Sequence, residues 1–302
     1  MTAPLFDGYF ADPFVLRTEA GYFAYGTNPL AAADDRVFEV LESNDLKNWV
    51  SHGGALLRPD ATLGSDFWAP EVVERDGEFW MYYSVGHGIT GHHLRVARAG
   101  SPLGPFVDGG ENLTPHELFA IDAHPFRDES GEWYLYYARD VLTGERPGTA
   151  LAVDRMLSPT QLAGTPTDVL RPFADWQLYE AQRLIHGARY DWHTLEGPTA
   201  VYRNGNYWLT FSGGSWEGAG YGVTWASAPH PLGPWSPADS SEPRLLETGD
   251  DLLGPGHNSL VVGPHGGDII VFHSWNESRT RRELYAAEVR FDQDGPHRDA
   301  PW

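Results

Sequence analysis

The sequence of 302 residues contains no cysteine. This excludes both a disulfide framework and a metal site built from thiolates. No stretch approaches the roughly 20 consecutive apolar residues that a membrane-spanning helix needs. The N-terminal stretch MTAPLFDGYFADPF has an acidic residue where a secretion signal would have a basic start and an apolar run. We therefore expect a cytoplasmic protein.

Basic residues are also scarce, because Lys and Arg total 21 against 42 Asp and Glu, for a formal net charge of −21. Nucleic acids and anionic membranes are bound by clustered basic side chains, so both are unfavourable partners, and a neutral ligand fits better. Aromatic residues are frequent, with 12 Trp, 14 Tyr and 14 Phe. Their faces suit strand packing and the apolar faces of sugar rings, and we expect packing to account for most of them.

Helical periodicity is nearly absent, because Gly, Pro and short aromatic or β-branched runs interrupt most windows long enough for a helix. This indicates an all-β fold. Five segments begin with glycine and continue as an aromatic-rich strand: GYFAYGT from Gly21, GEFWMYYS from Gly77, GEWYLYYA from Gly131, GNYWLTFS from Gly205 and GDIIVFHS from Gly267. Each follows another apolar run, and the two together are typical of a β-hairpin whose turn ends in glycine.

The repetition of these hairpins predicts the architecture. Two of the units continue into a third strand with a similar ending, LRVARAGSPLGPF at 94–106 and VTWASAPHPLGPW at 223–235. Radial repetition of four-stranded sheets is one way to protect sheet edges, and five such sheets account for nearly the whole chain. We therefore predict a single domain, residues 1–302, folded as a five-bladed β-propeller.

The turn glycines also define a register. Nine residues before the glycine stand Asp12, Trp68, Asp122 and Glu196, and in the fifth unit the distance to His257 is ten residues. The first strands of propeller blades lie innermost and run in the same direction, so these residues are expected at one mouth of a central funnel. Each has an ordinary structural explanation when taken alone, such as a turn, a solvated loop acid or a buried histidine. Their shared register favours a site.

Three carboxylates around a narrow pocket cannot all ionise as surface acids do, because desolvation and mutual repulsion raise at least one pKa. A protonated carboxyl group can then give its proton to a leaving oxygen, while an ionised one activates water. Glycosidic bonds are hydrolysed by carboxyl pairs of this kind. The third carboxylate would hold the acid in place and keep it protonated at neutral pH.

Five short motifs occur in the order ADPF, WAPEV, AIDAHPF, EGP and GPGHNS. They resemble the blade signatures of glycoside hydrolase family 43, which comprises inverting arabinofuranosidases, xylosidases and arabinanases, and the similarity covers almost the whole chain. It implies that Asp12 is the general base, Glu196 the general acid and Asp122 the carboxylate that orients and tunes this acid. It also implies that His257 faces a hydrated calcium or similar ion on the propeller axis. No organic cofactor is expected.

Four further residues are candidates for substrate binding. Trp68 offers a ring face to a sugar, with core packing as the alternative. His124 lies two positions past the second Asp and thus on the same side of a strand. Trp192 lies just before the predicted acid, where packing of a long loop is an equal alternative. In the segment TRRELY, an Arg-x-Leu pattern resembles the family's fifth-blade arginine, which Arg282 fits better than Arg281.

Histidines also cluster in GHGITGHH at residues 86–93. A zinc site would need a scaffold such as HExxH, which is absent, so we expect a polar loop at the rim of the pocket.

These observations predict an inverting, exo-acting enzyme that releases terminal α-L-arabinofuranosyl residues from arabinan or arabinoxylan oligosaccharides. A β-D-xylosidase, an endo-arabinanase and a non-catalytic sugar-binding propeller remain alternatives, as do retaining five-bladed fructosidases, whose nucleophile is also an Asp before Pro. Direct attack by water requires roughly 6.5–9.5 Å between the two carboxyl groups. Exo action is expected because the bulky insertion at 171–195 would wall one end of the funnel.

Overall fold

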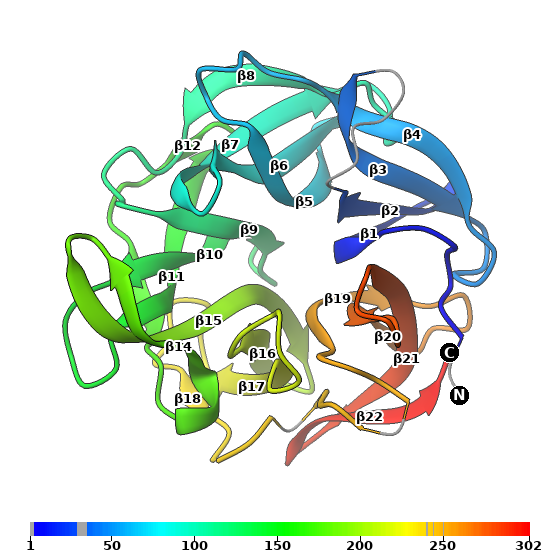
Figure 1. Cartoon of the computed structure of the whole chain (residues 1–302). Coiled ribbons are helices and arrows are strands. Elements are labelled where there is room, and N and C mark those ends of the chain that lie inside the picture. The colour runs from blue at the N-terminus through cyan, green and yellow to red at the C-terminus, as the bar shows by residue number, and fades with distance from the viewer. Residues whose placement is uncertain (1–2, 29–34, 240, 244, 250) are drawn as a thin grey trace.

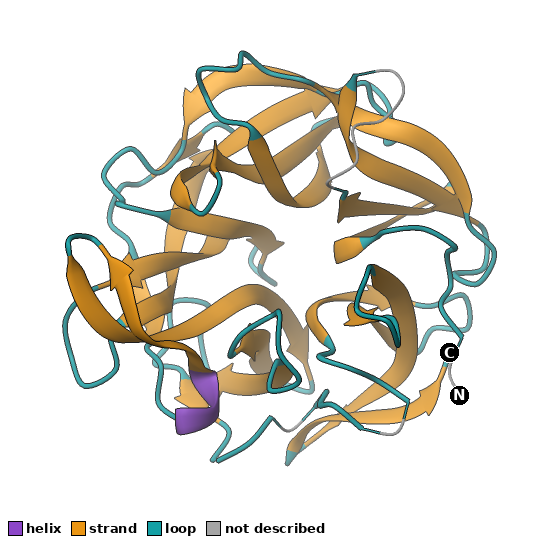
Figure 2. Cartoon of the chain, in the orientation of Figure 1, coloured by secondary structure: helices purple, strands orange, loops and turns teal. Residues whose placement is uncertain are grey.

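The computed structural model of the protein describes residues 3–28, 35–239, 241–243, 245–249 and 251–302. Almost all regular structure in these residues is β-strand, and their only helical element is one 3-10 turn, Asp175–Gln177 (Figure 2). None of the described segments forms a helix of the length and apolar character needed to cross a membrane. The all-β prediction is confirmed.

Two antiparallel sheets form the first third of the chain, each with its strands in sequence order. The first sheet contains β1 (Ala11–Thr18), β2 (Gly21–Thr27), β3 (Arg36–Ser43) and β4 (Val50–Leu57). The second sheet contains β5 (Asp66–Arg75), β6 (Glu78–His87), β7 (Thr90–Ala99) and β8 (Val107–Asn112).

The middle of the chain forms a ten-stranded sheet made of two antiparallel groups. The first group contains β9 (Ala120–Arg127), β10 (Trp133–Val141), β11 (Gly148–Ser158), β12 (Gln161–Leu162) and β13 (Thr167–Leu170). The second group contains β14 (Leu178–Ile185), β15 (Ala188–Arg203), β16 (Asn206–Gly213), β17 (Gly222–Ala228) and β18 (Ser236–Pro237). The groups meet where β11 pairs in parallel with β15.

A last antiparallel sheet contains β19 (Gly256–Val262), β20 (Asp268–Trp275), β21 (Arg282–Asp292) and β22 (Gly295–Pro301). The sheets are arranged around a common centre, with β1, β5, β9, β15 and β19 innermost (Figure 1). Each innermost strand contacts the next one in this order, and β19 contacts β1. The N-terminal segment joins the last sheet, because the N–H of Phe10 donates to the carbonyl of Arg282 at 2.9 Å. The starts of β1, β5, β9 and β19 and the middle of β15 therefore come together.

The hydrophobic core lies between neighbouring sheets. Five clusters of buried residues each combine two adjacent strand groups. In one of them, Tyr25 and Phe38 of the first sheet pack with Val72 and Tyr83 of the second. Each buried side chain of this size stabilises the fold by about 1.5–3 kcal/mol relative to exposure. Because the apolar faces are used between sheets, the strand starts at the centre are free to carry polar side chains.

One tyrosine contact is repeated between neighbouring strand groups. Counted outward from the innermost strand of each group, a tyrosine on the second strand donates its hydroxyl to the carbonyl of a proline that follows the third strand of the next group. The pairs are Tyr25–Pro102 at 2.6 Å, Tyr82–Pro159 at 2.9 Å and Tyr136–Pro231 at 2.7 Å. The rings fill the core while the hydroxyls find partners, so the repeated strand endings hold adjacent sheets together.

Candidate active site

Each of the five innermost strands has one residue in the left-handed backbone region, near the start of β1, β5, β9 and β19 and in the middle of β15. The φ angles are 50° for Asp12, 47° for Ala69, 61° for Asp122, 56° for Gly197 and 45° for His257. Pairing with the second strand shifts register at each of these positions, as at a β-bulge, which re-aims side chains. We call these five the bulge residues. Non-glycine residues rarely adopt this conformation, and such strain is concentrated at functional sites.

The bulge residues show which positions of the five innermost strands are equivalent, and these differ in part from the positions nine or ten residues before the turn glycines. Trp68 and Glu196 stand one position ahead of the bulge residues in their strands, so the prediction that they share a register with Asp12 is wrong. The cause is the turn. Gly205 lies inside its hairpin turn, whereas Gly21 is already paired as the first residue of β2, so equal counts reach different positions.

One cavity, which we call the central cavity, brings six of the predicted residues together. Its empty volume, open mouth included, is ≈ 810 Å³. The predicted residues that line it are Asp12, Trp68, Asp122, Glu196, His257 and Arg282. The residues that the sequence analysis did not name are Tyr9, Thr27, Ile89, Ile121 and Trp216. The two Asp and the Glu thus meet at one place although they lie far apart in the chain.

Asp12 is buried, and the side chains of one arginine and two histidines surround its carboxylate. Arg282 Nη1 donates to Asp12 Oδ1 at 3.0 Å, and His273 Nδ1 and His257 Nδ1 lie 3.3 and 3.6 Å from the same oxygen. Burial is the largest single influence and raises the pKa of Asp12, but Arg282, the two histidines and a hydrogen bond from Thr27 together outweigh burial and hold the pKa well below its usual range. Asp12 is therefore ionised at neutral pH, as a general base requires.

Glu196 has the opposite environment. Burial raises the pKa of Glu196 to about 7, and the negative charge of Asp12 adds to this effect. The hydroxyl of Tyr221 donates to Glu196 Oε1 at 2.6 Å, which lowers the pKa in part. Burial and the charges of Glu196 and Asp12 also raise the pKa of Asp122. The Asp122 and Glu196 pair therefore retains a proton near neutral pH.

Asp122 is bonded directly to the backbone behind Glu196. The N–H of Gly197 donates to Asp122 Oδ2 at 2.9 Å. Gly197 has a positive φ, and a Cβ at this position would lie 3.1 Å from the ring of His257, so glycine fits here for two reasons. The predicted orienting carboxylate thus fixes the peptide that follows the predicted acid.

The other four bulge residues are held in a different way. Their N–H groups donate to a side chain on the second strand of the preceding group. The pairs are Ala69–Thr27 at 2.9 Å, Asp122–Ser84 at 3.0 Å, His257–Ser212 at 2.7 Å and Asp12–His273 at 3.0 Å. At the junction before Gly197 the matching residue is Ala138, which pairs with Ile121 as Ser84 pairs with Trp68. Alanine offers no acceptor, and the carboxylate of Asp122 takes this place.

His257 lies between the two aspartates, with Nδ1 3.6 Å from Asp12 Oδ1 and 3.9 Å from Asp122 Oδ2. Burial lowers the pKa of His257, which keeps the ring neutral at neutral pH. No group of three or more His, Asp or Glu side chains in the described residues is arranged to hold a metal ion. A metal held mainly by protein ligands does not fit this arrangement, and we assign no chemical step to one.

The structure settles which arginine reaches the cavity. Arg282 bonds to Asp12 and to the hydroxyl of Tyr9, and its guanidinium lies 4.6 Å from the ring centroid of Trp216. Arg281 points elsewhere and pairs with acidic side chains outside the cavity.

Trp68 lines the cavity with one face already occupied. The ring of His92 stacks on it at 3.6 Å between centroids, so one face of the indole remains available to a ligand. His92 belongs to the histidine-rich segment 86–93, which forms the β6–β7 hairpin tip. Ile89 at this tip lines the central cavity, in line with the expected rim loop.

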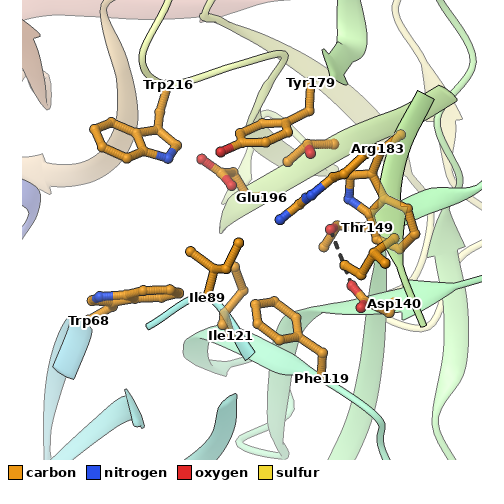
Figure 3. Close-up of a pocket in the computed structure, with 13 residues that line it drawn as sticks. Trp68, Ile89, Phe119, Ile121, Asp140, Thr149, Tyr179, Arg183, Glu196 and Trp216 are labelled. Carbon is orange, nitrogen blue, oxygen red and sulfur yellow. Dashed lines mark hydrogen bonds between the residues drawn. The ribbon is translucent and has the colours of Figure 1, made fainter. Parts of the chain in front are cut away.

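Two predicted substrate-binding residues lie elsewhere. His124 is buried beside the cavity lining without being part of it. Its Nδ1 lies 2.7 Å from Glu71 Oε2, and its Nε2 accepts the N–H of Ala200 at 3.0 Å. Both nitrogens are used, so a role in substrate contact is not supported. Trp192 is 1% exposed and lines an adjoining pocket that shares Glu196 with the central cavity (Figure 3).

The sequence analysis missed Tyr221, Tyr9 and Trp216. Tyr9 stands three residues before Asp12, which is a signal that could have been followed. Tyr221 and Trp216 lie in the irregular segment between β16 and β17. That segment has no periodicity, and only the folded chain shows that it turns back over Glu196.

An ionised aspartate and a carboxyl pair that retains a proton near neutral pH, in one cavity, define the site of a hydrolase that cleaves glycosidic bonds by acid and base chemistry. Residues 1–296 match the model of glycosyl hydrolases family 43, and the chain belongs to this family.

Characterised relatives differ in their substrates. The chain is 30% identical over 298 residues to the β-D-galactofuranosidase xynD of Aspergillus niger, covering 93% of this chain and 78% of that protein. It is 27% identical to an extracellular exo-α-(1→5)-L-arabinofuranosidase of Streptomyces avermitilis, covering 88% of this chain and 54% of the relative. The crystal structure of a thermostable family-43 glycoside hydrolase matches with a TM-score of 0.84 at 29% identity, covering 99% of this chain and 96% of that one. The protein is thus a glycoside hydrolase acting on carbohydrate.

Proposed function

We propose that the protein is an inverting, exo-acting glycosidase that releases terminal α-L-arabinofuranosyl residues from arabinan or arabinoxylan oligosaccharides. One observation carries the mechanism: Asp12 and Glu196 line the same cavity with their pKa values displaced in opposite directions. The arabinofuranoside preference is supported by the relative of that activity.

In the proposed reaction, water attacks the anomeric carbon as Asp12 accepts a proton from it. The bond between this carbon and the leaving oxygen breaks, and Glu196 gives its proton to that oxygen. The products are an inverted sugar and a free hydroxyl on the leaving group, with Asp12 protonated and Glu196 ionised until a proton returns through solvent. Asp122 would raise the pKa of Glu196 and position its backbone. Arg282 would keep Asp12 ionised.

We further propose that these residues stand on one five-bladed β-propeller domain spanning 1–302. The cyclic contacts of the five innermost strands support this architecture. Exo action is supported by the β14–β15 hairpin, which contributes Tyr179, Ile185 and Trp192 to the pocket beside Glu196.

A second candidate is a β-D-galactofuranosidase, because a relative of that activity is 30% identical. The two furanosides share the arrangement of their ring substituents and differ in the exocyclic chain. A panel of p-nitrophenyl α-L-arabinofuranoside, β-D-galactofuranoside and β-D-xylopyranoside separates the candidates by kcat/KM. We expect the arabinofuranoside to be cleaved fastest. A faster galactofuranoside or xyloside would replace the assignment, and cleavage of none of them or of arabinan oligomers would favour a binding protein.

Inversion is tested separately by proton NMR of fresh product. The expected first product has the anomeric configuration opposite to that of the substrate. A retained anomer would overturn direct attack by water and favour a nucleophilic Asp12, as in the retaining fructosidases.

A calcium ion held largely by water near His257 also remains a proposal, because single-ligand sites depend on solvent. Activity and melting temperature after chelation, followed by return of calcium, test it. If activity and melting temperature stay the same after chelation and after return of calcium, the proposed ion has no role in this protein. Cytoplasmic location is likewise a proposal, tested by fractionation of the producing cell.

A further inference from the structure

A second pocket adjoins the central cavity on the side of Glu196 (Figure 3). Its empty volume is ≈ 480 Å³. Glu196, Trp68 and Trp216 line both spaces, whereas Asp12 and Asp122 line only the central cavity. A general acid stands between the sugar that is released and its leaving group, and the base stands beside the released sugar. The pocket that contains Glu196 without Asp12 is therefore placed to receive the leaving group.

The outer wall of this pocket is the β14–β15 hairpin. Its turn at His186 and Gly187 has φ angles of 49° and 77°, which suit a tight two-residue turn. His186 Nε2 lies 2.7 Å from Asp140 Oδ2, and this contact ties the hairpin tip to β10. A second bond within the hairpin, from the N–H of Gln182 to Asp191, keeps its two strands in register. The wall is therefore fixed to the body of the protein.

Arg183 projects from this hairpin into the pocket, with its guanidinium toward Glu196 (Figure 3). The guanidinium carbon lies 4.7 Å from the ring centroid of Tyr179 and 5.6 Å from that of Trp192. These rings fix its direction, and the side chain is only 13% exposed. Within the described chain, its nearest ionic partner is Glu180 at 3.7 Å, and no hydrogen bond from the guanidinium is found. The guanidinium is held in place while its N–H groups have no hydrogen-bond partner, so it suits a ligand that carries hydrogen-bond acceptors.

The charges around Arg183 indicate which acceptors these are. Asp140 lines the same pocket, with a side chain only 3% exposed, and Glu180 lies on the outer side. These two carboxylates already balance the single positive charge. The whole chain carries −21, so an anionic sugar would meet repulsion on approach. Hydroxyl groups and a ring oxygen are the better match.

We propose that this pocket is a leaving-group subsite for one neutral sugar residue, and that Arg183 is its specificity-determining hydrogen-bond donor. The inference deepens the proposed function and rests on it. Arg183 donates hydrogen bonds to the sugar next to the scissile bond, and the rings of Tyr179 and Trp216 form the walls of the space around this sugar. The preferred substrates are then oligosaccharides, because a small aryl leaving group uses fewer of these contacts.

The experiment compares kcat/KM for α-1,5-linked arabinobiose with that for p-nitrophenyl α-L-arabinofuranoside, in the wild type and in Arg183→Met. We expect the ratio of the two values to fall about ten- to hundredfold in the variant, as for loss of a charge-assisted hydrogen bond. Arg189→Met is the matched control. Arg189 lies on the same hairpin, is exposed and donates to the carbonyl of Gln182, so the ratio stays at its wild-type value.

Arg183→Lys keeps the charge without the planar fork and is expected to give an intermediate ratio. It also provides a second reading if Arg183→Met is unstable in a thermal melt. Equal losses on both substrates, or no loss in either variant, would overturn the inference. Faster cleavage by the wild type when the leaving sugar is a uronate would overturn its neutral character. If the wild type cleaves neither an aryl glycoside of the panel nor arabinan oligomers, the proposed function itself fails, and this is known before any variant is measured.

Discussion

Asp12 and Glu196 line the same cavity and carry the same functional group, yet their surroundings drive their protonation in opposite directions. Asp12 has the guanidinium of Arg282 at 3.0 Å, and this charge, with His257, His273 and a hydrogen bond from Thr27, overcomes the effect of burial. Glu196 has no salt-bridge partner in the described residues and accepts one hydrogen bond from Tyr221. The groups that surround Asp12, with Arg282 the strongest of them, thus separate two carboxyl groups into a base and an acid. The difference between the two pKa values depends on neighbouring groups, so substitutions beside either carboxyl group are expected to change it.

Removing the base is expected to have the largest effect. Asp12→Asn takes away the proton acceptor for water and leaves Arg282 without its ionic partner. We expect kcat to fall by about 10³–10⁴ on every substrate, with the fold retained. Steady-state kinetics on aryl and oligosaccharide substrates measure this, with circular dichroism as the control for folding. Turnover close to wild type in a folded variant would refute the role of Asp12.

Removing the acid is expected to depend on the leaving group. Glu196→Gln keeps the shape and loses the proton, so cleavage of arabino-oligosaccharides falls by about 10²–10⁴. Aryl glycosides with a very acidic phenol leave without protonation, and their kcat falls much less. The measurement is a plot of kcat against the leaving-group pKa, which becomes steeper in the variant. An equal loss across all leaving groups would argue against Glu196 as the acid.

Asp122 carries a charge and a hydrogen bond, and two variants separate these contributions. Asp122→Asn keeps an oxygen for the N–H of Gly197 but removes the charge that opposes ionisation of Glu196. The pKa of Glu196 then falls, and the alkaline limb of the pH–rate profile moves to lower pH. Asp122→Ala also loses the bond and is expected to be about tenfold slower than Asp122→Asn.

Adding Ala138→Ser to Asp122→Ala supplies a hydroxyl like those of Thr27, Ser84 and Ser212 at three of the other junctions, and part of the lost rate is expected to return. The pH profile of the double variant keeps its shifted alkaline limb because the charge is still missing. Identical rates in all Asp122 variants would contradict a structural part for this carboxylate.

The smallest effect is expected from Tyr221→Phe. Its hydroxyl stabilises the ionised form of Glu196 and lowers the pKa, so its loss raises the pKa further. Glu196 then keeps its proton to higher pH, and the alkaline limb moves upward from about 7. The change in kcat at the optimum is within about threefold, as for one neutral hydrogen bond. A downward shift of this limb would show that Tyr221 acts differently.

Much of the fold could be read from the sequence because strands repeat locally. Glycine-led aromatic strands such as the one from Gly131 fall on second strands, and each follows an innermost strand. The three acids were found because each belongs to a short motif on an innermost strand. The register of Glu196 was one residue off, since a glycine does not show its own place within a turn. Tyr221 was missed because its segment has no period, and Arg183 was missed because the sequence of β14 does not show which of its side chains reaches the site.

The alanine at position 138 has an evolutionary consequence. At this one junction, inside the ten-stranded sheet, the N–H of Gly197 is bonded by a carboxylate of the active site, Asp122, because Ala138 supplies no hydroxyl. If a descendant lost hydrolysis and then lost Asp122, the N–H of Gly197 would lose its hydrogen-bond acceptor. A serine or threonine at position 138 would restore one. In a lineage that loses activity by changing residue 122, we therefore expect residue 138 to change as well.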